Sequence, residues 1–102
     1  MITTGLQQRL GIEYPIIGGA MMDLSTPEWV STVANSGALG LHTSATYKNH
    51  DEFRTALRET KNLTDRPFGV NLTLLPTVTP PPYAEYLAAI IESGVKVVEL
   101  TD

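Results

Sequence analysis

Phe68-Gly-Val-Asn-Leu72 is a short apolar run whose start is clearly marked. It follows Asp65-Arg-Pro67, which breaks any preceding helix, and it is typical of a buried strand. Similar runs are Ala38-Leu-Gly-Leu-His42 and Val95-Lys-Val-Val-Glu-Leu100, and the first in the chain is Tyr14-Pro-Ile-Ile-Gly18. The predicted strands therefore begin at intervals of about 27 residues, which leaves room for one helix between each pair.

Segments with helical periodicity separate these strands. Ser25-Thr-Pro-Glu28 combines a capping-box spacing with a proline near the first helical position, and Gly37 ends that helix. A second helix begins after Asn49 or Asp51, and a third begins at about Tyr83. Residues that we expect these two helices to bury are Phe53, Ala56, Leu57 and Leu63 in the second and Tyr86, Leu87, Ile90 and Ile91 in the third. Alternating strands and helices predict a parallel sheet with right-handed crossovers.

A parallel sheet is normally covered on both faces or closed into a barrel, and a complete eight-stranded barrel takes about 250 residues. We therefore predict an α/β chain that forms the N-terminal four βα units of a TIM (β/α)8 barrel, with residues 1–102 belonging to one domain. A small open α/β domain and a half-barrel that pairs with a second copy are the alternatives. Open sheet edges would favour self-association. Residues expected on the inner strand faces, without part of their core, are Ile16, Leu41, Val70 and Val97 or Val98.

Composition excludes several classes of function. The 102 residues include 7 Lys and Arg against 11 Asp and Glu, a net charge of -4, which disfavours nucleic acid and anionic membrane surfaces as partners. The absence of cysteine excludes a disulfide framework, a thiolate nucleophile and a cysteine zinc site. His42 and His50 are too few for a multi-histidine metal centre. No signal peptide or apolar run of roughly 20 residues is visible, so we expect a cytoplasmic protein without a membrane span.

Ligands of parallel α/β folds bind at the carboxyl ends of the strands. Gly18-Gly-Ala-Met-Met22 follows the first predicted strand, where glycines let the backbone approach a flat ligand, although a tight turn would need the same residues. The Asn71 amide is suited to hydrogen-bond with the polar edge of a heterocyclic ligand. The alternative is a structural role, in which the amide hydrogen-bonds the strand to the following loop. Thr73 follows on the same face. His42 is either a general base or, more commonly for a lone histidine at a strand end, a structural residue.

Three stretches resemble the nitronate monooxygenase family, formerly called 2-nitropropane dioxygenases. They are Tyr14-Pro-Ile-Ile-Gly-Gly-Ala-Met21, Val33-Ala-Asn-Ser-Gly-Ala-Leu-Gly40 and Leu63-Thr-Asp-Arg-Pro-Phe-Gly-Val-Asn-Leu72. The run from Asn71-Leu-Thr-Leu-Leu-Pro76 to Pro82-Tyr-Ala-Glu-Tyr86 is most similar to the branch that includes NADH:quinone reductases. Flavin-type enoyl-ACP reductases share the early motifs. The resemblance covers the whole chain but only about the first third of a family member.

The resemblance implies an FMN-dependent oxidoreductase built on a TIM barrel, acting on a small molecule, a nitronate or a quinone, with NAD(P)H as a possible electron donor. Residues that it assigns to FMN binding are Ala20, Met21 and Met22, through the backbone, together with Asn71 and Thr73. Ala20 stands where the family usually has glycine. The catalytic histidine and phosphate loops of the family come later in the barrel, and His42 does not match that histidine. The chain thus holds no predicted catalytic or metal-binding residue, and we expect it to be inactive alone. The alternative is a non-catalytic or self-associating α/β fragment without flavin.

Overall fold

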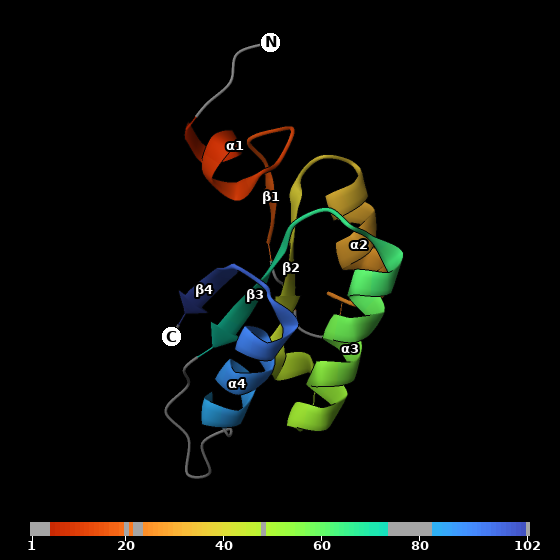
Figure 1. Ribbon diagram of the computed structural model, residues 1–102, viewed down its shortest axis with the longest axis vertical. Helices are drawn as coiled ribbons and strands as arrows, with labels where there is room; N and C mark the ends of the chain where they lie inside the picture. Colours follow the sequence, from red (N-terminus) through yellow and green to blue (C-terminus); the bar gives the residue numbers. More distant parts are fainter. Residues whose placement is uncertain (1–4, 20, 22–23, 48, 74–82, 102) are drawn as a thin grey trace.

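The computed structural model shows helices and strands that alternate along the chain (Figure 1). It describes residues 5–19, 21, 24–47, 49–73 and 83–101. In chain order the elements are α1 (Gly5–Leu10), β1 (Ile17–Gly18), α2 (Pro27–Asn35), β2 (Leu39–Thr43), the short 3-10 helix η1 (Ser44–Thr46), α3 (His50–Leu63), β3 (Phe68–Thr73), α4 (Tyr83–Ser93) and β4 (Val97–Thr101).

The four strands form one parallel sheet in the order β1-β2-β3-β4. Each strand pairs with the next one in the sequence, so successive βα units lie side by side. In the register of this sheet, Thr43 lies opposite Asn71, and Asn71 lies opposite Glu99. The parallel pairing and the sequential strand order confirm the predicted sheet.

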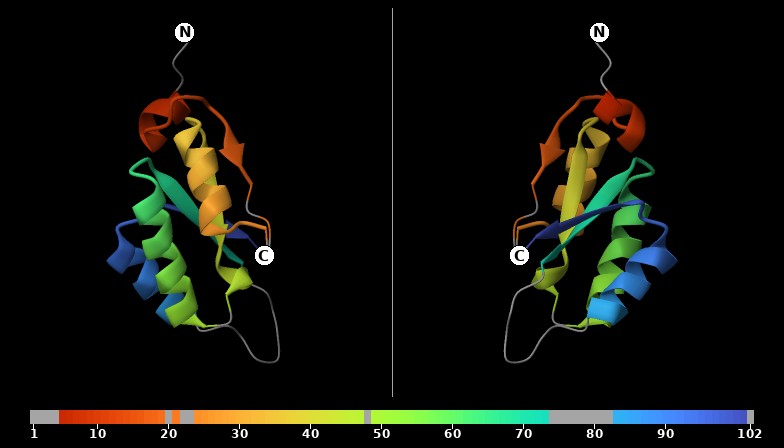
Figure 2. Two further views of the ribbon diagram at one scale, coloured as in Figure 1. Left: turned by 90° about the vertical axis from the view of Figure 1, so that its right-hand side faces the viewer. Right: turned by 90° about the vertical axis from the view of Figure 1, so that its left-hand side faces the viewer.

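Helices α2, α3 and α4 cover one face of the sheet, which we call the outer face (Figure 2). The main core lies beneath them. It joins Phe53 and Leu57 of α3 and Ile90 of α4 to Val70 and Leu72 of β3. Because side chains alternate along a strand, residues 68, 70 and 72 belong to the outer face and residues 69 and 71 belong to the opposite, inner face.

The inner face is covered near the beginnings of the strands. Ile12, which follows α1, packs with Leu39 and Leu41 of β2, and Val97 of β4 joins this smaller cluster. Helix α1 accordingly lies at the end of the sheet where the strands begin (Figure 1). The expected inner positions are therefore correct for Leu41 and Val97 and wrong for Val70, which lies among the helices.

The N-terminal part of the chain differs from the predicted pattern. The sequence pattern does not predict α1, a helix of 6 residues without an acidic residue in its first turn. The first strand was expected from Tyr14 but is only Ile17–Gly18. The backbone N–H of Tyr14 donates instead to the carbonyl of Gly37, 2.9 Å away, and Pro15 has no N–H to donate. These residues therefore join the turn between α2 and β2 rather than the sheet.

For α3 and α4, helical periodicity predicts a wider buried face than the structure shows. Tyr86 and Ile90 of α4 are buried as expected, whereas Leu87 is 41% exposed and Ile91 is 77% exposed. Leu63, at the end of α3, is 49% exposed. The two exposed α4 residues are one helical turn apart, so they form one flank of α4 that none of the described elements covers.

Candidate functional site

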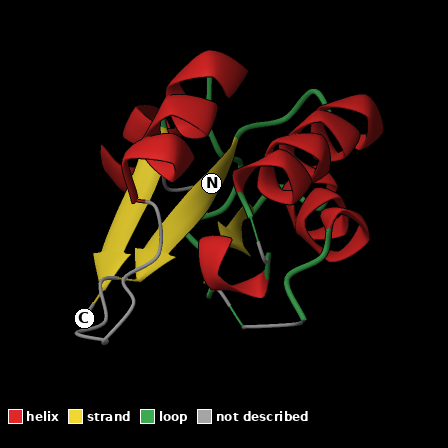
Figure 3. Ribbon diagram, turned by 90° about the horizontal axis from the view of Figure 1, so that it is seen from below, coloured by secondary structure: helices red, strands yellow, loops and turns green. Residues whose placement is uncertain are grey.

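A row of three polar residues crosses the inner face of the sheet close to the ends of the strands. Thr43 on β2, Asn71 on β3 and Glu99 on β4 occupy matching register positions, so their side chains share one level of the sheet. Figure 3 looks toward this end of the molecule. The carboxyl ends of parallel strands are where ligands bind in α/β folds, and polar groups from neighbouring strands converge there.

Asn71 forms the centre of this row. Its side chain is buried, with 5% of the residue exposed. The amide nitrogen, Nδ2, donates to the Glu99 carboxylate at 2.7 Å and to the Thr101 hydroxyl at 3.2 Å. Both partners lie on β4, so the amide links β3 to β4 on the inner face and its plane is held by two hydrogen bonds.

Thr43 contributes a buried hydroxyl to the row. The hydroxyl oxygen is shielded from solvent and has no hydrogen-bond partner within the described part of the chain. Buried polar atoms are rarely left unpaired, and such an atom beside a strand end is typical of a site that another group completes. Thr73 continues β3 in register with Thr101, and its backbone is placed at the same end of the sheet.

The loop after β1 reaches this end of the sheet and is fixed by Ser25. Met21 donates its N–H to the Ser25 hydroxyl at 2.8 Å, and the Met21 carbonyl accepts from the N–H of Ser25 at 2.9 Å. Ser25 is fully buried, whereas Met21 is 40% exposed. Ala20 and Met22, the other two predicted loop contacts, lie outside the described residues. The loop is thus anchored at Met21, and its side chain remains accessible.

Gly18, Ser25 and Thr26 flank this loop, and the structure assigns each of them a packing or hydrogen-bonding role that the sequence pattern alone does not identify. A Cβ atom on Gly18 would lie 3.1 Å from the Trp29 ring of α2, so this glycine makes room for a helix rather than for a flat ligand. The cap of α2 is Thr26, which accepts from the N–H of Trp29 at 3.2 Å. Ser25, the residue of the capping-box spacing, instead holds Met21.

His42 lies on the outer face of β2 and is fully buried, away from the polar row. Its Nε2 is 2.6 Å from the Thr60 hydroxyl on α3, and that hydroxyl donates to the carbonyl of Ala56 at 2.8 Å. Thr60 therefore accepts the Nε2 hydrogen of a neutral imidazole. Burial lowers the pKa of His42 to about 4, and the backbone of Ser25 opposes this shift only in part. This geometry favours the structural interpretation of His42.

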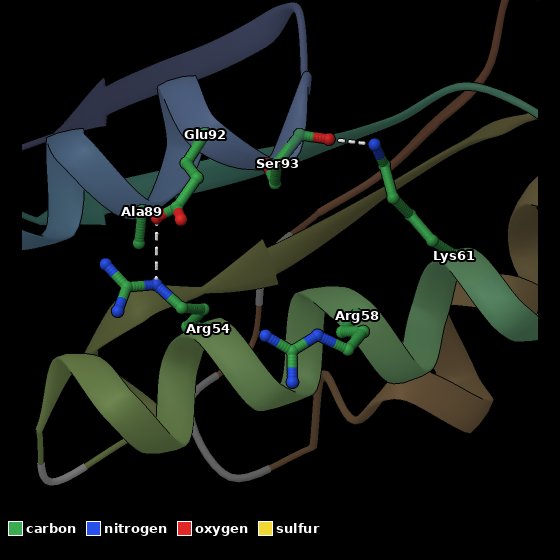
Figure 4. A pocket seen from close by; sticks show the side chains of 6 residues that line it. All are labelled: Arg54, Arg58, Lys61, Ala89, Glu92 and Ser93. Carbon is green, nitrogen blue, oxygen red and sulfur yellow. Dashed lines mark hydrogen bonds and ion pairs between the residues drawn. The ribbon is translucent and has the colours of Figure 1, made fainter.

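A cavity of about 200 Å³ lies between α3 and α4 (Figure 4), and none of the residues that line it belongs to the polar row. Its charged side chains hold the two helices together. Arg54 is 3.0 Å from the Glu92 carboxylate, and the Lys61 ammonium donates to the carbonyl of Ser93 at the end of α4. The cavity is therefore a gap between two packed helices, and its charged side chains bond to each other across it. Within the described residues, no group of three or more histidine or acidic side chains could hold a metal ion.

The sequence profile of the nitronate monooxygenase family matches residues 3–101. The chain belongs to the nitronate monooxygenase family. The matched residues include all four strands of the sheet and all three residues of the polar row. None of the helices in the described part of the chain is long and apolar enough to cross a membrane.

Curated relatives are similar to this chain over most of its length. Nitronate monooxygenase of Pseudomonas aeruginosa is 39% identical over 71 residues, which is 70% of this chain and 20% of the relative. A 5-hydroxy-7a-methyl-1-oxo-octahydro-1H-indene-4-carboxyl-CoA dehydrogenase of Rhodococcus jostii is 38% identical over the same shares. The chain thus spans about a fifth of the curated relatives that it matches.

The solved structure of FabK from Thermotoga maritima has the same fold in the matching region. It superimposes with a TM-score of 0.85 at 32% identity, covering 98% of this chain and 30% of FabK. FabK is a TIM barrel, so the four parallel strands and the helices that connect them form the N-terminal part of that fold, as predicted.

Two members of the polar row were not among the residues predicted for the site. Thr43 directly follows a predicted strand and Glu99 lies within another, so neither residue stands out in the sequence. Both would follow from the sequence if the register of the sheet were known, because it aligns them with Asn71. Strand periodicity gives the face of a residue within one strand but does not fix the level of that residue against the next strand.

Proposed function

We propose that residues 1–102 are the N-terminal part of a single FMN-binding TIM-barrel domain in an oxidoreductase of the nitronate monooxygenase or NAD(P)H:quinone reductase type. The family match over residues 3–101 supports the enzyme class. The observation that carries the location of the site is the row of Thr43, Asn71 and Glu99 at the strand ends, with its unpaired buried hydroxyl. These polar groups fit the hydrogen-bonding edge of a flavin ring.

We infer that Asn71 and Thr73 contact the flavin from β3 and that the loop of Ala20, Met21 and Met22 contacts it from β1. In this loop the N–H and carbonyl of Met21 are already paired with Ser25, so Met21 contributes through its accessible side chain. Thr43 supplies a hydroxyl from β2. FMN held there would supply the electron-transfer chemistry of an oxidoreductase, with oxygen or a quinone as the acceptor. The residues named here bind and orient the ring and keep water from its edge.

The substrate that we infer is a small molecule, a nitronate or a quinone, with NAD(P)H as electron donor in the second case. The nitronate monooxygenase of Pseudomonas aeruginosa supports the first. The similarity of the segments around Asn71 and Tyr86 to NADH:quinone reductases supports the second. Resemblance of the early motifs to flavin-type enoyl-ACP reductases makes reduction of an enoyl thioester a further candidate.

The test uses the purified full-length protein. We expect it to be yellow, or to become so with FMN, because bound oxidised flavin absorbs visible light. Oxygen uptake with a nitronate, quinone reduction with NADH or NADPH, and NAD(P)H oxidation with an enoyl thioester then separate the three candidate substrates. A protein that stays colourless after incubation with FMN and has none of these activities would favour the non-catalytic alternative and contradict the proposal.

A further inference from the structure

We propose that a second cavity, at the end of the sheet where the strands begin, binds an organic phosphate, a ligand with a phosphate group on an apolar body. Phe68 and Val97, the first residues of β3 and β4, line this cavity, which we call the basic cavity. None of its lining residues belongs to the candidate functional site. The proposal therefore does not depend on the proposed function.

The basic cavity has a volume of about 500 Å³, which is within the range of small-molecule sites. Its walls are the end of α1, the turn between α3 and β3, and the turn between α4 and β4. Two contacts join these walls. The Lys61 ammonium at the end of α3 donates to the carbonyl of Ser93 at the end of α4 (Figure 4), and Arg66 lies 3.7 Å from the Glu13 carboxylate. The cavity is therefore held in shape by the fold itself.

Positive charge gathers in the basic cavity although the chain has a net charge of -4. The lysine and arginine residues that line it are Arg9, Lys61, Arg66 and Lys96, out of 7 in the whole chain. Asp65 is the one acidic residue among the described residues of its lining. Arg9 and Lys96 form no ion pair with any residue that the structure describes. An anion in the cavity would therefore offset a local excess of positive charge.

The kind of anion follows from the number and type of these cations. A phosphate monoester carries about two negative charges near pH 7, whereas a carboxylate carries one. Arginine pairs with phosphate through two parallel hydrogen bonds, and lysine adds a point charge. The charges in the cavity thus match a phosphate better than a single carboxylate.

The rest of the lining favours an apolar body on this ligand. The apolar side chains of the basic cavity are those of Leu10, Pro67, Phe68, Val95 and Val97. Inorganic phosphate would use the cations alone, and an uncharged ring would use the apolar walls alone. A ligand that carries both groups buries apolar surface and pairs its charge in the same cavity, so we expect it to bind more tightly than either part.

A structural role is the competing explanation for some of these cations. Arg9 lies in the last turn of α1 and Lys61 in the last turn of α3, where a positive charge stabilises a helix. Lys96 lies between α4 and β4, outside both elements, so this explanation does not apply to it. A cation that serves a helix end stabilises the protein without any ligand. One that serves a ligand adds stability only when the anion is bound.

Calorimetric titration of the full-length protein tests the proposal, with FMN present so that the candidate flavin site is exposed to its own ligand. The probes are phenyl phosphate, inorganic phosphate and benzyl alcohol. The variants are Lys96→Gln and Arg9→Gln, which remove the two cations without ion pairs. Arg58→Gln is the matched control, because Arg58 is an exposed cation of α3 that does not line the basic cavity. Thermal melts without phenyl phosphate measure the stability of each variant.

We expect phenyl phosphate to bind at least about tenfold more tightly than inorganic phosphate or benzyl alcohol, because only phenyl phosphate uses both parts of the cavity. Lys96→Gln and Arg9→Gln should each weaken its binding by about threefold to tenfold, as expected for loss of one partly exposed charge contact. Arg58→Gln should stay within about twofold of the wild type. Lys96→Gln should melt at the wild-type temperature when no phosphate is present.

Three results would overturn the proposal. Absence of phenyl phosphate binding, or equal weakening by Arg58→Gln and Lys96→Gln, would show that the cavity has no specific anion site. Equal affinities for phenyl phosphate and inorganic phosphate would contradict the apolar part of the ligand. Lower melting temperatures of Arg9→Gln and Lys96→Gln with unchanged phenyl phosphate affinity would assign these cations to the stability of the fold.

Discussion

His42 is a neutral imidazole held inside the protein, and this makes the stability of the fold depend on pH. Burial lowers the pKa of His42 to about 4 in the folded state, from 6.5 in a solvated chain. Between these two values the unfolded chain binds a proton that the folded chain does not bind. Stability that is present above pH 6.5 is therefore lost as the pH falls toward 4.

We predict that this loss amounts to about 3 kcal/mol of unfolding free energy, from the size of the pKa shift. Urea unfolding of the full-length protein at a series of pH values between 7 and 4 measures it. Replacement of His42 by Gln should lower stability at pH 7, because the Thr60 contact changes, and should flatten the acid loss by about that amount.

Substitution of His50 by Gln is the control for this prediction. His50 lies at the start of α3, its side chain is 33% exposed, and it contacts the Glu85 carboxylate at 3.0 Å. The acid loss caused by His42 should persist in this variant. An equally steep pH dependence in the His42 variant and the wild type would show that another group is responsible.

At the scale of single residues, the sequence predicted Asn71 correctly as a buried polar residue at a strand end but did not predict its partners. An amide in an apolar strand is conspicuous because it must find hydrogen bonds. Glu99 resembles an ordinary surface charge until β4 is aligned with β3. The role of Ser25 was not predictable either. The sequence pattern assigns its hydroxyl to a helix cap, whereas in the structure this hydroxyl accepts a hydrogen bond from the N–H of Met21.

At the scale of elements, the contact of α2 with the sheet depends on glycines in the strands. A Cβ atom added to Gly40 of β2 would lie 2.6 Å from the carbonyl oxygen of Val30 in α2. That atom belongs to the helix backbone, so the whole helix would have to shift. We predict that Gly40→Ala destabilises the full-length protein by about 1–3 kcal/mol, the usual cost of overpacking, measured by urea unfolding.

Gly5→Ala is the matched control for Gly40→Ala. An added Cβ on Gly5 meets nothing within 4 Å, and the residue begins α1. This variant should leave the unfolding free energy unchanged or raise it by a few tenths of a kcal/mol through helix propensity. Equal effects of the two alanines would contradict the tight contact between α2 and β2.

Helices with marked caps and strongly apolar strands were predictable, and short elements were not. Asn49 caps α3 as expected, accepting from the N–H of Glu52 at 2.9 Å. β1 pairs with β2 over only two residues, and the residues before it are drawn to the turn at Gly37. Such tertiary contacts are not encoded in local periodicity, which is also why the exposed flank of α4 was expected to be buried.

At the scale of the whole molecule, the sheet of the described chain is open. β1 and β4 each have a neighbour on one side only, and Val98 and Leu100 of β4 are 41% and 62% exposed. Open edges with apolar side chains favour pairing with another chain. We predict that residues 1–102 expressed alone self-associate or melt at a low temperature, bind FMN weakly and show no turnover.

Light scattering, thermal melts and FMN absorbance of this piece, compared with the full-length protein, check that prediction. The full-length protein should bind flavin and turn over under the same conditions. A monomeric, stable, yellow and active protein of 102 residues would show that the open sheet is sufficient, and it would place the whole site within these four strands.

The claim at the centre of this account is that Asn71 helps to hold FMN at the ends of the parallel strands. Titration of the full-length apo-protein with FMN, for the wild type, Asn71→Ala and the exposed-helix control Asn62→Ala, tests it most directly. Loss of a hydrogen bond to a bound polar group is worth about 0.5–1.5 kcal/mol, so Asn71→Ala should weaken FMN binding by about twofold to tenfold while Asn62→Ala binds as the wild type does. Equal FMN affinity in all three proteins, with a lower melting temperature for Asn71→Ala alone, would show that this amide only joins β3 to β4 and would contradict the account.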